Sequence, residues 1–149
     1  MKFFYIIAFM EKQIIGRIDR ADFPDLGLEN IAIKVDTGAY TSSIHCDEII
    51  EENNVLKCYF RDEEHPVYDR KMFTFKDYRK VQVRSSNGIL QERYAISSKI
   101  KLFNRIHTIS LSLNDRSDMR FPVLIGRKFL RGKFIVDPQL EDLSFTSEN

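Results

Sequence analysis

The segment KVDTGAYTSSIHC, residues 34–46, decides how this chain folds and what it can do. An apolar run, residues 31–35, stops at Asp36, and Thr37 and Gly38 follow directly. Because glycine tolerates backbone conformations that other residues avoid, this triplet predicts a tight turn at the end of a strand. An acid in that position either forms the turn or is held there for chemistry.

Length and composition are typical of an ordinary globular protein. The 149 residues are 43% hydrophobic and 30% charged, which is enough to bury a core, and we expect one domain over residues 1–149. The net charge of +1 creates no overall field that favours nucleic acid or an anionic membrane, so we expect neither as a partner. Cys46 and Cys58 are too few for a disulfide framework, which indicates two reduced thiols.

The first ten residues, MKFFYIIAFM, look like the start of a signal peptide. Their apolar run is short, it meets Glu11 and Lys12 directly, and no small-residue cleavage site follows. It is also far below the roughly 20 residues that span a bilayer. Two interpretations stay open, an appended apolar strand over residues 1–9 or a true start at Met10, and the second is favoured. We therefore expect a cytoplasmic protein.

Alternation of apolar and polar residues is the dominant pattern, and it predicts half-buried antiparallel strands. It is clearest at residues 81–84, 99–102 and 109–113. Asn87-Gly88 lies between two such runs and is the strongest short signal for a hairpin, because both residues tolerate positive φ. Many short strands separated by turns predict an all-β barrel or sandwich.

One segment is predicted as a convincing helix, RKFLRG at residues 127–132, and Gly132 can end it. The segment DEIIEENN, residues 47–54, is a weaker helix candidate. The rest of the chain is expected to be strand and turn.

Several chemistries lack the residues that they need. The three histidines form no HExxH motif and meet no paired CxxC or acidic cluster, so neither a metal nor another cofactor is expected. No GxSxG elbow accompanies the serines, and no partner histidine is placed for a cysteine nucleophile. No glycine-rich loop opens a helix, and the aromatic residues are not interleaved with a basic stripe, which argues against phosphate and nucleic-acid binding.

Two runs resemble the retropepsin-like aspartic proteases, in which an apolar strand enters Asp-Thr-Gly-Ala and a later one enters Gly-Arg and a short helix. The similarity extends to a bacterial and archaeal branch that is often labelled "ATP-dependent zinc protease" and linked to ATP-grasp glutamate ligases. No ligand set for zinc is present. The elements that carry the resemblance run from Ile14 to Pro138: IIGRIDRADFPDLGL, KVDTGAYTSSIHC, VRSSNG, RYAI, RSDMRFPVLIGRKFL and FIVDP.

The resemblance implies a small retropepsin-like β-barrel with one short C-terminal helix and an aspartic endopeptidase activity that needs no metal. One Asp-Thr-Gly per chain implies a homodimer in which two Asp36 carboxylates share one proton at a two-fold axis. Thr37 and nearby N–H groups would hold the carboxylates, and Gly38 would let the backbone approach the acid. Thr41, Ser42 and Ser43 either add donors around the acid or simply fill the strand.

The resemblance also implies a peptide or protein substrate, held beneath a flap. Residues Ser85, Ser86, Asn87 and Gly88 are the candidate flap, or else a plain turn. Several arginines lie near the motif segments, and they either bind an acidic, Glu-rich peptide or face solvent and pair with acids of the chain: Arg84, Arg93, Arg116, Arg120 and Arg127.

Two further alternatives stay open. The stretch after Asp-Thr-Gly holds no acid for Arg127, which therefore pairs elsewhere, with Asp137 or Asp115, or meets an anionic substrate. The chain could also be a catalytically inactive retropepsin-like domain that binds a peptide or a protein. A metallopeptidase is supported by the family label alone.

Overall fold

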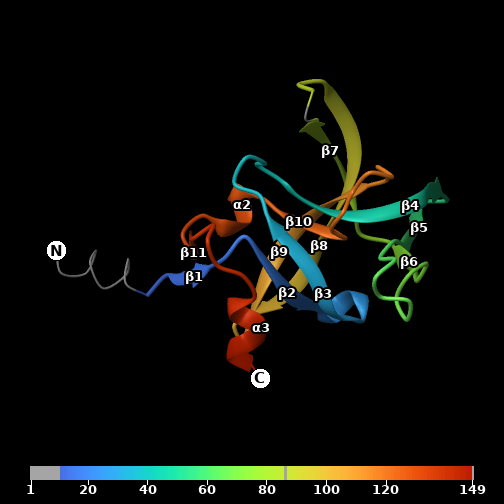
Figure 1. Ribbon diagram of the computed structural model, residues 1–149. Coiled ribbons are helices and arrows are strands. Elements are labelled where there is room, and N and C mark those ends of the chain that lie inside the picture. Colours follow the sequence, from blue (N-terminus) through green and yellow to red (C-terminus); the bar gives the residue numbers. More distant parts are fainter. Residues whose placement is uncertain (1–10, 86, 149) are drawn as a thin grey trace.

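The computed structural model describes residues 11–85 and 87–148 (Figure 1). The expectations for residues 1–10 and for Ser86 lie outside the described residues. Of the described residues, 54% are in strands and 9% in helices, and six strands close into a barrel. The predicted all-β, retropepsin-like barrel is therefore confirmed. None of the helices in the described ranges is long and apolar enough to cross a membrane.

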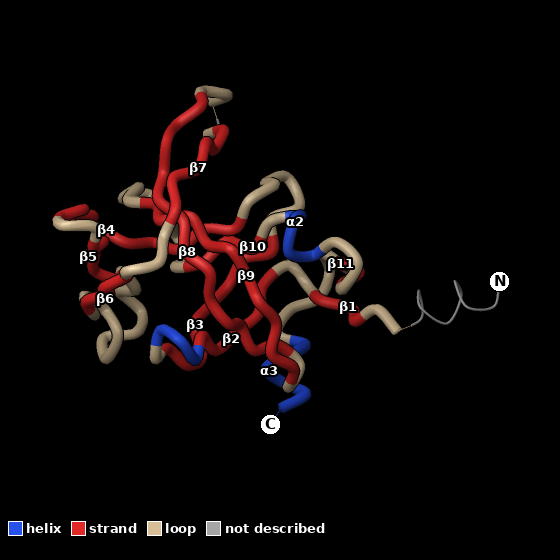
Figure 2. The backbone as a smooth tube through the Cα atoms, turned by 180° about the vertical axis from the view of Figure 1, so that it is seen from behind, coloured by secondary structure: helices blue, strands red, loops and turns tan. Residues whose placement is uncertain are grey.

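The barrel is closed because its first and last strands pair with each other (Figure 2). The order around the ring is β10 (Val123–Ile125), β3 (Leu28–Val35), β2 (Ile18–Phe23), β8 (Leu90–Leu102), β9 (Arg105–Asn114) and β4 (Ser42–Glu52), and β4 pairs with β10 again. The alternation predicted at residues 99–102 and 109–113 is confirmed, since the apolar members are buried: Ile100, Leu102, Ile109, Leu111 and Leu113. Alternate side chains point inward because successive residues of a strand face opposite sides.

The remaining elements surround this ring. Strand β4 continues through a hairpin into β5 (Val55–Phe60) and β6 (Met72–Phe75), while β7 (Arg79–Arg84) pairs with β8. A separate parallel pair joins β1 (Gln13–Ile15) to β11 (Phe134–Val136). The helical segments are η1 (Pro24–Leu26), α2 (Arg127–Leu130) and α3 (Leu143–Glu148).

The helix expected after Gly126 is confirmed as α2, although it ends at Leu130, and Gly132 takes the left-handed conformation at φ 79°. The weaker helix candidate at residues 47–54 is wrong. Strand β4 continues to Glu52, and Asn53 and Asn54 form the turn at φ 52° and 60°. Pairing with β5 outweighs the local helix preference of the Glu-rich run.

The sequence did not predict α3, because its first turn is bound from a distant strand. The buried Asp19 carboxylate accepts N–H bonds from Ser144 at 2.9 Å and Phe145 at 3.1 Å. These are N–H groups that a helix start leaves without a partner. Burial raises the pKa of Asp19, although the N–H groups around it act in the opposite direction.

Both cysteines are buried free thiols, as the sequence predicts. Cys46 lies on β4 and Cys58 on the neighbouring β5. The hydrogen bond with Cys58, together with burial, raises the pKa of Cys46 well above its usual value. A thiol that stays protonated behaves as a small apolar core residue and is a poor nucleophile.

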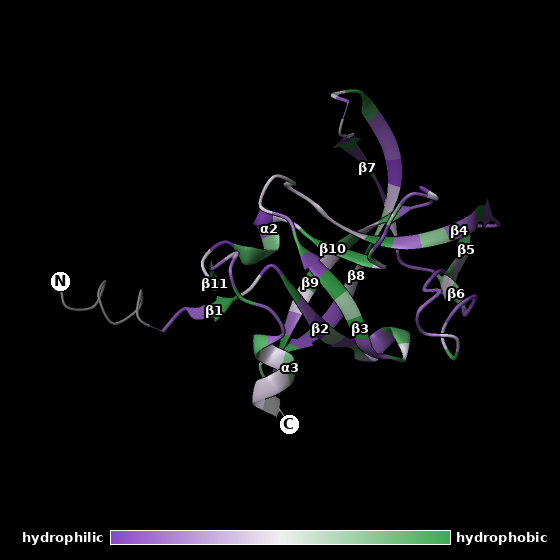
Figure 3. Ribbon diagram, viewed as in Figure 1, coloured by the Kyte–Doolittle hydropathy of each residue, from purple (hydrophilic) through white to green (hydrophobic). Residues whose placement is uncertain are grey.

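The hairpin predicted at Asn87-Gly88 is confirmed, and it projects beyond the barrel as the outer parts of β7 and β8 (Figure 1). At its end, the Gly88 N–H donates to the Ser85 carbonyl at 2.9 Å, and Gly88 has φ 84°. The hairpin is mainly hydrophilic, with a hydrophobic stretch close to its tip (Figure 3), where Ile89 and Leu90 are exposed.

Strand β10 is inserted between the two strands that flank Asp36. Val123 pairs with Ile33 of β3 in parallel and with Ile44 of β4 in antiparallel orientation. The chain leaves β10 through Gly126, where a Cβ atom would lie 2.6 Å from the Thr41 carbonyl oxygen. Only a residue without a side chain therefore lets these two backbone segments lie so close together.

We expect Gly126→Ala to lower the free energy of unfolding by about 2 kcal/mol or more, because the added methyl group meets rigid backbone. Gly132→Ala is the matched control, since a Cβ atom there has open space and only the left-handed φ is strained, which costs about 1 kcal/mol. Urea denaturation of both variants checks the order. A Gly126→Ala protein as stable as the parent would contradict the close approach.

Candidate active site

The Asp36 turn orients its own carboxylate. The Asp36 N–H donates to the Ile125 carbonyl at 2.8 Å, which ties the turn to the end of β10. The Gly38 N–H donates to Asp36 Oδ1 at 3.0 Å, and a Cβ atom on Gly38 would lie only 3.2 Å from that oxygen. Asp36 is half-buried, whereas Thr37 and Gly38 are exposed. The turn thus presents an oriented acid at an open edge of the barrel.

The loop after Asp36 is held by the start of α2. The Arg127 N–H donates to the Ala39 carbonyl at 2.8 Å, and the Lys128 N–H donates to the Tyr40 carbonyl at 3.0 Å. Arg127 Nη1 also donates to the Thr37 carbonyl at 3.1 Å, and its guanidinium lies over the Tyr40 ring, 5.7 Å from the centroid. Arg127 therefore holds this loop through its main-chain N–H at Ala39 and through its guanidinium at Thr37 and Tyr40.

Neither acid suggested for Arg127 is its partner in the structure. No ion pair joins Arg127 to Asp115 or Asp137 within the described part of the chain. A backbone carbonyl and an aromatic face replace the missing carboxylate. Because the guanidinium is exposed, its role in meeting an anionic substrate stays a prediction.

The hydroxyl residues after the turn serve the backbone. The buried Ser42 accepts the Gly126 N–H on Oγ at 3.0 Å, and its carbonyl accepts a bond from the Ser112 hydroxyl at 3.3 Å. Ser42 thus joins β4 to the end of β10 and to β9. Ser43 is also buried and pairs with Leu124 of β10.

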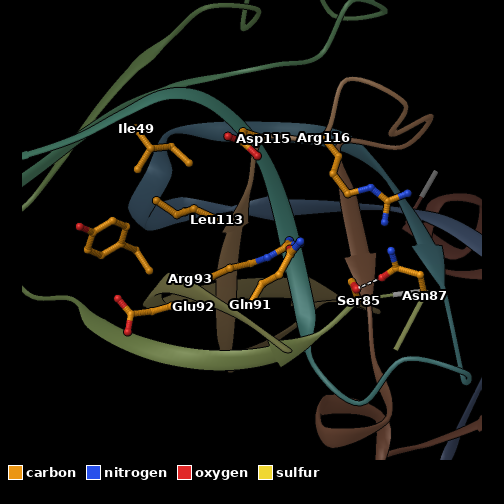
Figure 4. Close-up of a pocket in the computed structure, with 10 residues that line it drawn as sticks. Ile49, Ser85, Asn87, Gln91, Glu92, Arg93, Leu113, Asp115 and Arg116 are labelled. Atoms are coloured by element: carbon orange, nitrogen blue, oxygen red, sulfur yellow. Dashed lines mark hydrogen bonds between the residues drawn. The ribbon is translucent and has the colours of Figure 1, made fainter. Parts of the chain in front are cut away.

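A cavity of about 750 Å³ lies beside the hairpin and brings together four of the residues that the sequence suggested for substrate binding (Figure 4): Ser85, Asn87, Arg93 and Arg116. The Ser85 hydroxyl bonds Asn87 across its rim, and Arg84 donates to the Gly88 carbonyl at 2.9 Å. Neither Asp36 nor Arg127 is among the described residues that line this cavity. The other lining residues are Ile49, Gln91, Glu92, Tyr94, Leu113 and Asp115.

Charge is balanced in this first cavity. The lining holds two arginines, Arg93 and Arg116, and two acids, Glu92 and Asp115, and Arg116 also bonds Asp118 at 3.1 and 2.9 Å. Burial lowers the pKa of Arg93, while the Asp118 carboxylate raises that of Arg116. For Arg116, the expectation of pairing with an acid of the chain is therefore met.

A second cavity, of about 460 Å³, lies where the chain enters β10. Here the buried Asp62 contacts His65 Nδ1 at 3.2 Å, and burial raises the pKa of Asp62. The pKa of His45, in the same cavity, is lowered first by burial and then by the charge of Arg61. This pair was not predicted from the sequence, although the spacing of three residues between Asp62 and His65 was an available signal. The cavity balances three arginines against three acids: Arg20, Arg61, Arg120, Asp62, Glu63 and Glu64.

A third cavity, of about 390 Å³, borders the loop after Asp36. Thr41 and Ser42 form one side, and Arg79 and Val81 of the hairpin strand β7 form another. Its cations, including Lys128, were not predicted as site residues, because they come from elements that meet only in the folded barrel. Within residues 11–85 and 87–148, no group of three metal-ligating side chains is placed to hold an ion.

Relatives of this chain include longer proteins. It is 34% identical over 131 residues to a protein of Shewanella halifaxensis and 30% identical over 149 residues to one of Desulfotalea psychrophila, each named "Probable alpha-L-glutamate ligase". These matches cover 85% and 87% of this chain. The chain spans only 29% of the length of either relative.

A solved structure and a family model agree with the barrel. The crystal structure of Lpg0085, a Legionella pneumophila protein of unknown function, has a TM-score of 0.68 at 26% identity, covering 89% of this chain and 98% of that one. The family model described as "Retropepsin-like aspartic endopeptidase RimB" matches residues 14–145, from β1 into α3. The chain therefore belongs to the RimB-like family of retropepsin-like aspartic endopeptidases.

Proposed function

We propose that this protein is an aspartic endopeptidase that acts as a homodimer, with Asp36 of each subunit supplying the two carboxylates. The observation that carries the proposal is the Asp36 turn, whose carboxylate is oriented by the Gly38 N–H at an exposed edge of a RimB-like barrel. A single carboxylate cannot act as both acid and base at once. The exposure of Thr37 and Gly38 is consistent with a second copy of the same turn facing the first.

The chemistry follows from two carboxylates that share one proton, since like charges a few ångström apart cannot both ionise at neutral pH. The ionised Asp36 takes a proton from a bound water, and the resulting hydroxide attacks the carbonyl carbon of the substrate amide. The protonated Asp36 donates to the carbonyl oxygen. When the C–N bond breaks, the pair gives its proton to the leaving nitrogen, a hydroxyl of the tetrahedral intermediate returns a proton to the pair, and the starting state is restored.

The β7–β8 hairpin fits the part of a flap. It projects from the barrel, and Ile89 and Leu90 near its tip are exposed although they are apolar. Apolar side chains at such a tip gain a partner when the hairpin closes over a peptide, and closure excludes water from the reacting carboxylates. Ser85, Asn87 and Gly88 would then bind the substrate backbone, together with Ser86.

We further propose that the peptide is acidic. The curated relatives carry names of glutamate ligases, and a peptidase domain beside a ligase suits a substrate that contains glutamate. The exposed guanidinium of Arg127 lies at the Thr37 carbonyl, next to the catalytic acid. Planar guanidinium groups bind carboxylates through two parallel hydrogen bonds.

We expect Asp36→Asn to reduce peptide cleavage by at least about 100-fold, because the amide neither accepts the proton of water nor donates an acidic one. Asp25→Asn, at an exposed acid in η1, is the matched control and should leave the rate unchanged. EDTA should not affect the parent enzyme, and size-exclusion chromatography with light scattering should show dimers of both variants. Cleavage by Asp36→Asn, loss of activity with EDTA, or a strictly monomeric active species would each contradict the mechanism.

We expect a Glu-rich peptide to be cleaved about ten times faster than the same peptide with Gln in place of Glu, measured as kcat/KM at low ionic strength. The preference should shrink as NaCl rises from about 0.05 to 0.5 M, since exposed charges are screened over shorter distances. Equal rates on the two peptides at low salt would refute the acidic substrate while leaving the aspartic mechanism intact.

A further inference from the structure

We infer that the third cavity, between the hairpin strand β7 and helix α2, is the subsite that holds an acidic side chain of the peptide, with Arg79, Lys128 and Lys133 as its cations. This inference rests on the proposed function and names the residues that would give that site its selectivity. These three residues differ from the arginines that the sequence singled out.

The charge around the cavity is the first argument. Its described lining residues include the three cations and no acid. By contrast, the cavity beside the hairpin tip is lined by two arginines and two acids. The cavity at the start of β10 is lined by three arginines and three acids. Uncompensated positive charge in a hollow of about 390 Å³ favours an anionic group.

Hydroxyl groups line the same cavity. Strands β8 and β9 pair so that Ser97 lies opposite Ser110 and Ala95 lies opposite Ser112. Because alternate residues share a face of a strand, these serines form one polar floor. The Ser97 and Ser110 hydroxyls can donate to the oxygens of a carboxylate, which accepts about four hydrogen bonds, whereas the Ser112 hydroxyl donates to the Ser42 carbonyl. The complete set of hydroxyl residues in the lining is Thr41, Ser42, Ser97, Thr108, Ser110 and Ser112.

Two of the cations are already held in place. Arg79 donates to the Ser110 hydroxyl on the floor. Lys133 donates to the Phe129 carbonyl at 3.0 Å, and its ammonium lies 4.9 Å from the centroid of the Phe129 ring. Cations that are ordered before the ligand arrives lose less conformational entropy on binding. The charge of Lys133 also acts on His107. Burial is the main cause that lowers the pKa of His107, and the charges of Lys133 and Arg105 lower it further.

The position of the cavity connects it to the reaction. Thr41 and Ser42 belong to the loop that leaves Asp36, and the Lys128 N–H holds that loop through the Tyr40 carbonyl. Val81 and Arg79 come from the hairpin that we propose as the flap. An extended peptide advances about 3.3 Å per residue, so a peptide between flap and turn can direct a side chain into the cavity within a few residues of the cleaved bond.

The test compares Lys128→Gln with the parent on two peptides, one with Glu and one with Gln at the positions flanking the cleaved bond. The Lys128 side chain is exposed, so the variant should fold. We expect kcat/KM on the Glu peptide to fall about tenfold, with the Gln peptide unchanged. Lys133→Gln should do the same, whereas Lys57→Gln, at an exposed lysine on β5, should change neither rate. An equal loss on both peptides, or no loss in either variant, would overturn the subsite.

Binding separates this inference from the proposed function. Fluorescence titration of a labelled Glu peptide against Asp36→Asn, and against the same protein with Lys128→Gln added, needs no catalysis. We expect the second Kd to be about ten times higher and the Kd of the Gln peptide to stay constant. This result would support the subsite even if the parent cleaved neither peptide. Equal Kd values in the two proteins would refute the subsite even if Asp36 proved catalytic.

Discussion

The insertion of β10 between β3 and β4 is the constraint on which the rest of this structure depends. It closes the barrel, since β10 pairs on both sides, and it buries Val123 and Ile125 completely. Closure pairs each of the six barrel strands on both sides, while in the described part of the chain β6 and β7 each keep one unpaired edge outside the ring. The same insertion ties the Asp36 N–H to the Ile125 carbonyl. Strand β10 therefore both closes the barrel and anchors the backbone of the turn that carries Asp36.

This arrangement also explains why Gly126 and Arg127 follow β10. The glycine lets the chain pass against the Tyr40 and Thr41 carbonyls, and the arginine then reaches back to the Thr37 carbonyl. In many retropepsins an acid holds the corresponding arginine. Here the Tyr40 ring and the Thr37 carbonyl contact the Arg127 guanidinium instead. No acid among the described residues forms an ion pair with Arg127, so its positive charge remains beside Asp36. This charge is consistent with the acidic peptide that we propose as the substrate.

The near-zero net charge of the chain conceals an uneven distribution. Two of the cavities are internally neutral, because arginines and carboxylates that are distant in sequence meet there. Among the described residues that line the cavity beside the Asp36 loop, three are cations, none is an acid and several carry hydroxyl groups. Selectivity for charge can therefore reside in one small region of an otherwise neutral protein, where composition gives no sign of it.

The sequence alone determined the elements that local patterns specify: alternating strands, the Asn87-Gly88 hairpin, the turn at Asp36 and the helix after Gly126. Each of these elements depends on residues that are close together in the sequence. Only the tertiary structure decided the strand at residues 47–52, the Asp19 contact that begins α3, the partner of Arg127 and the lining of the cavities. The physical reason is that these features arise from contacts between residues far apart in sequence, made when β10 and the hairpin take their places in the barrel, and no local pattern carries that information.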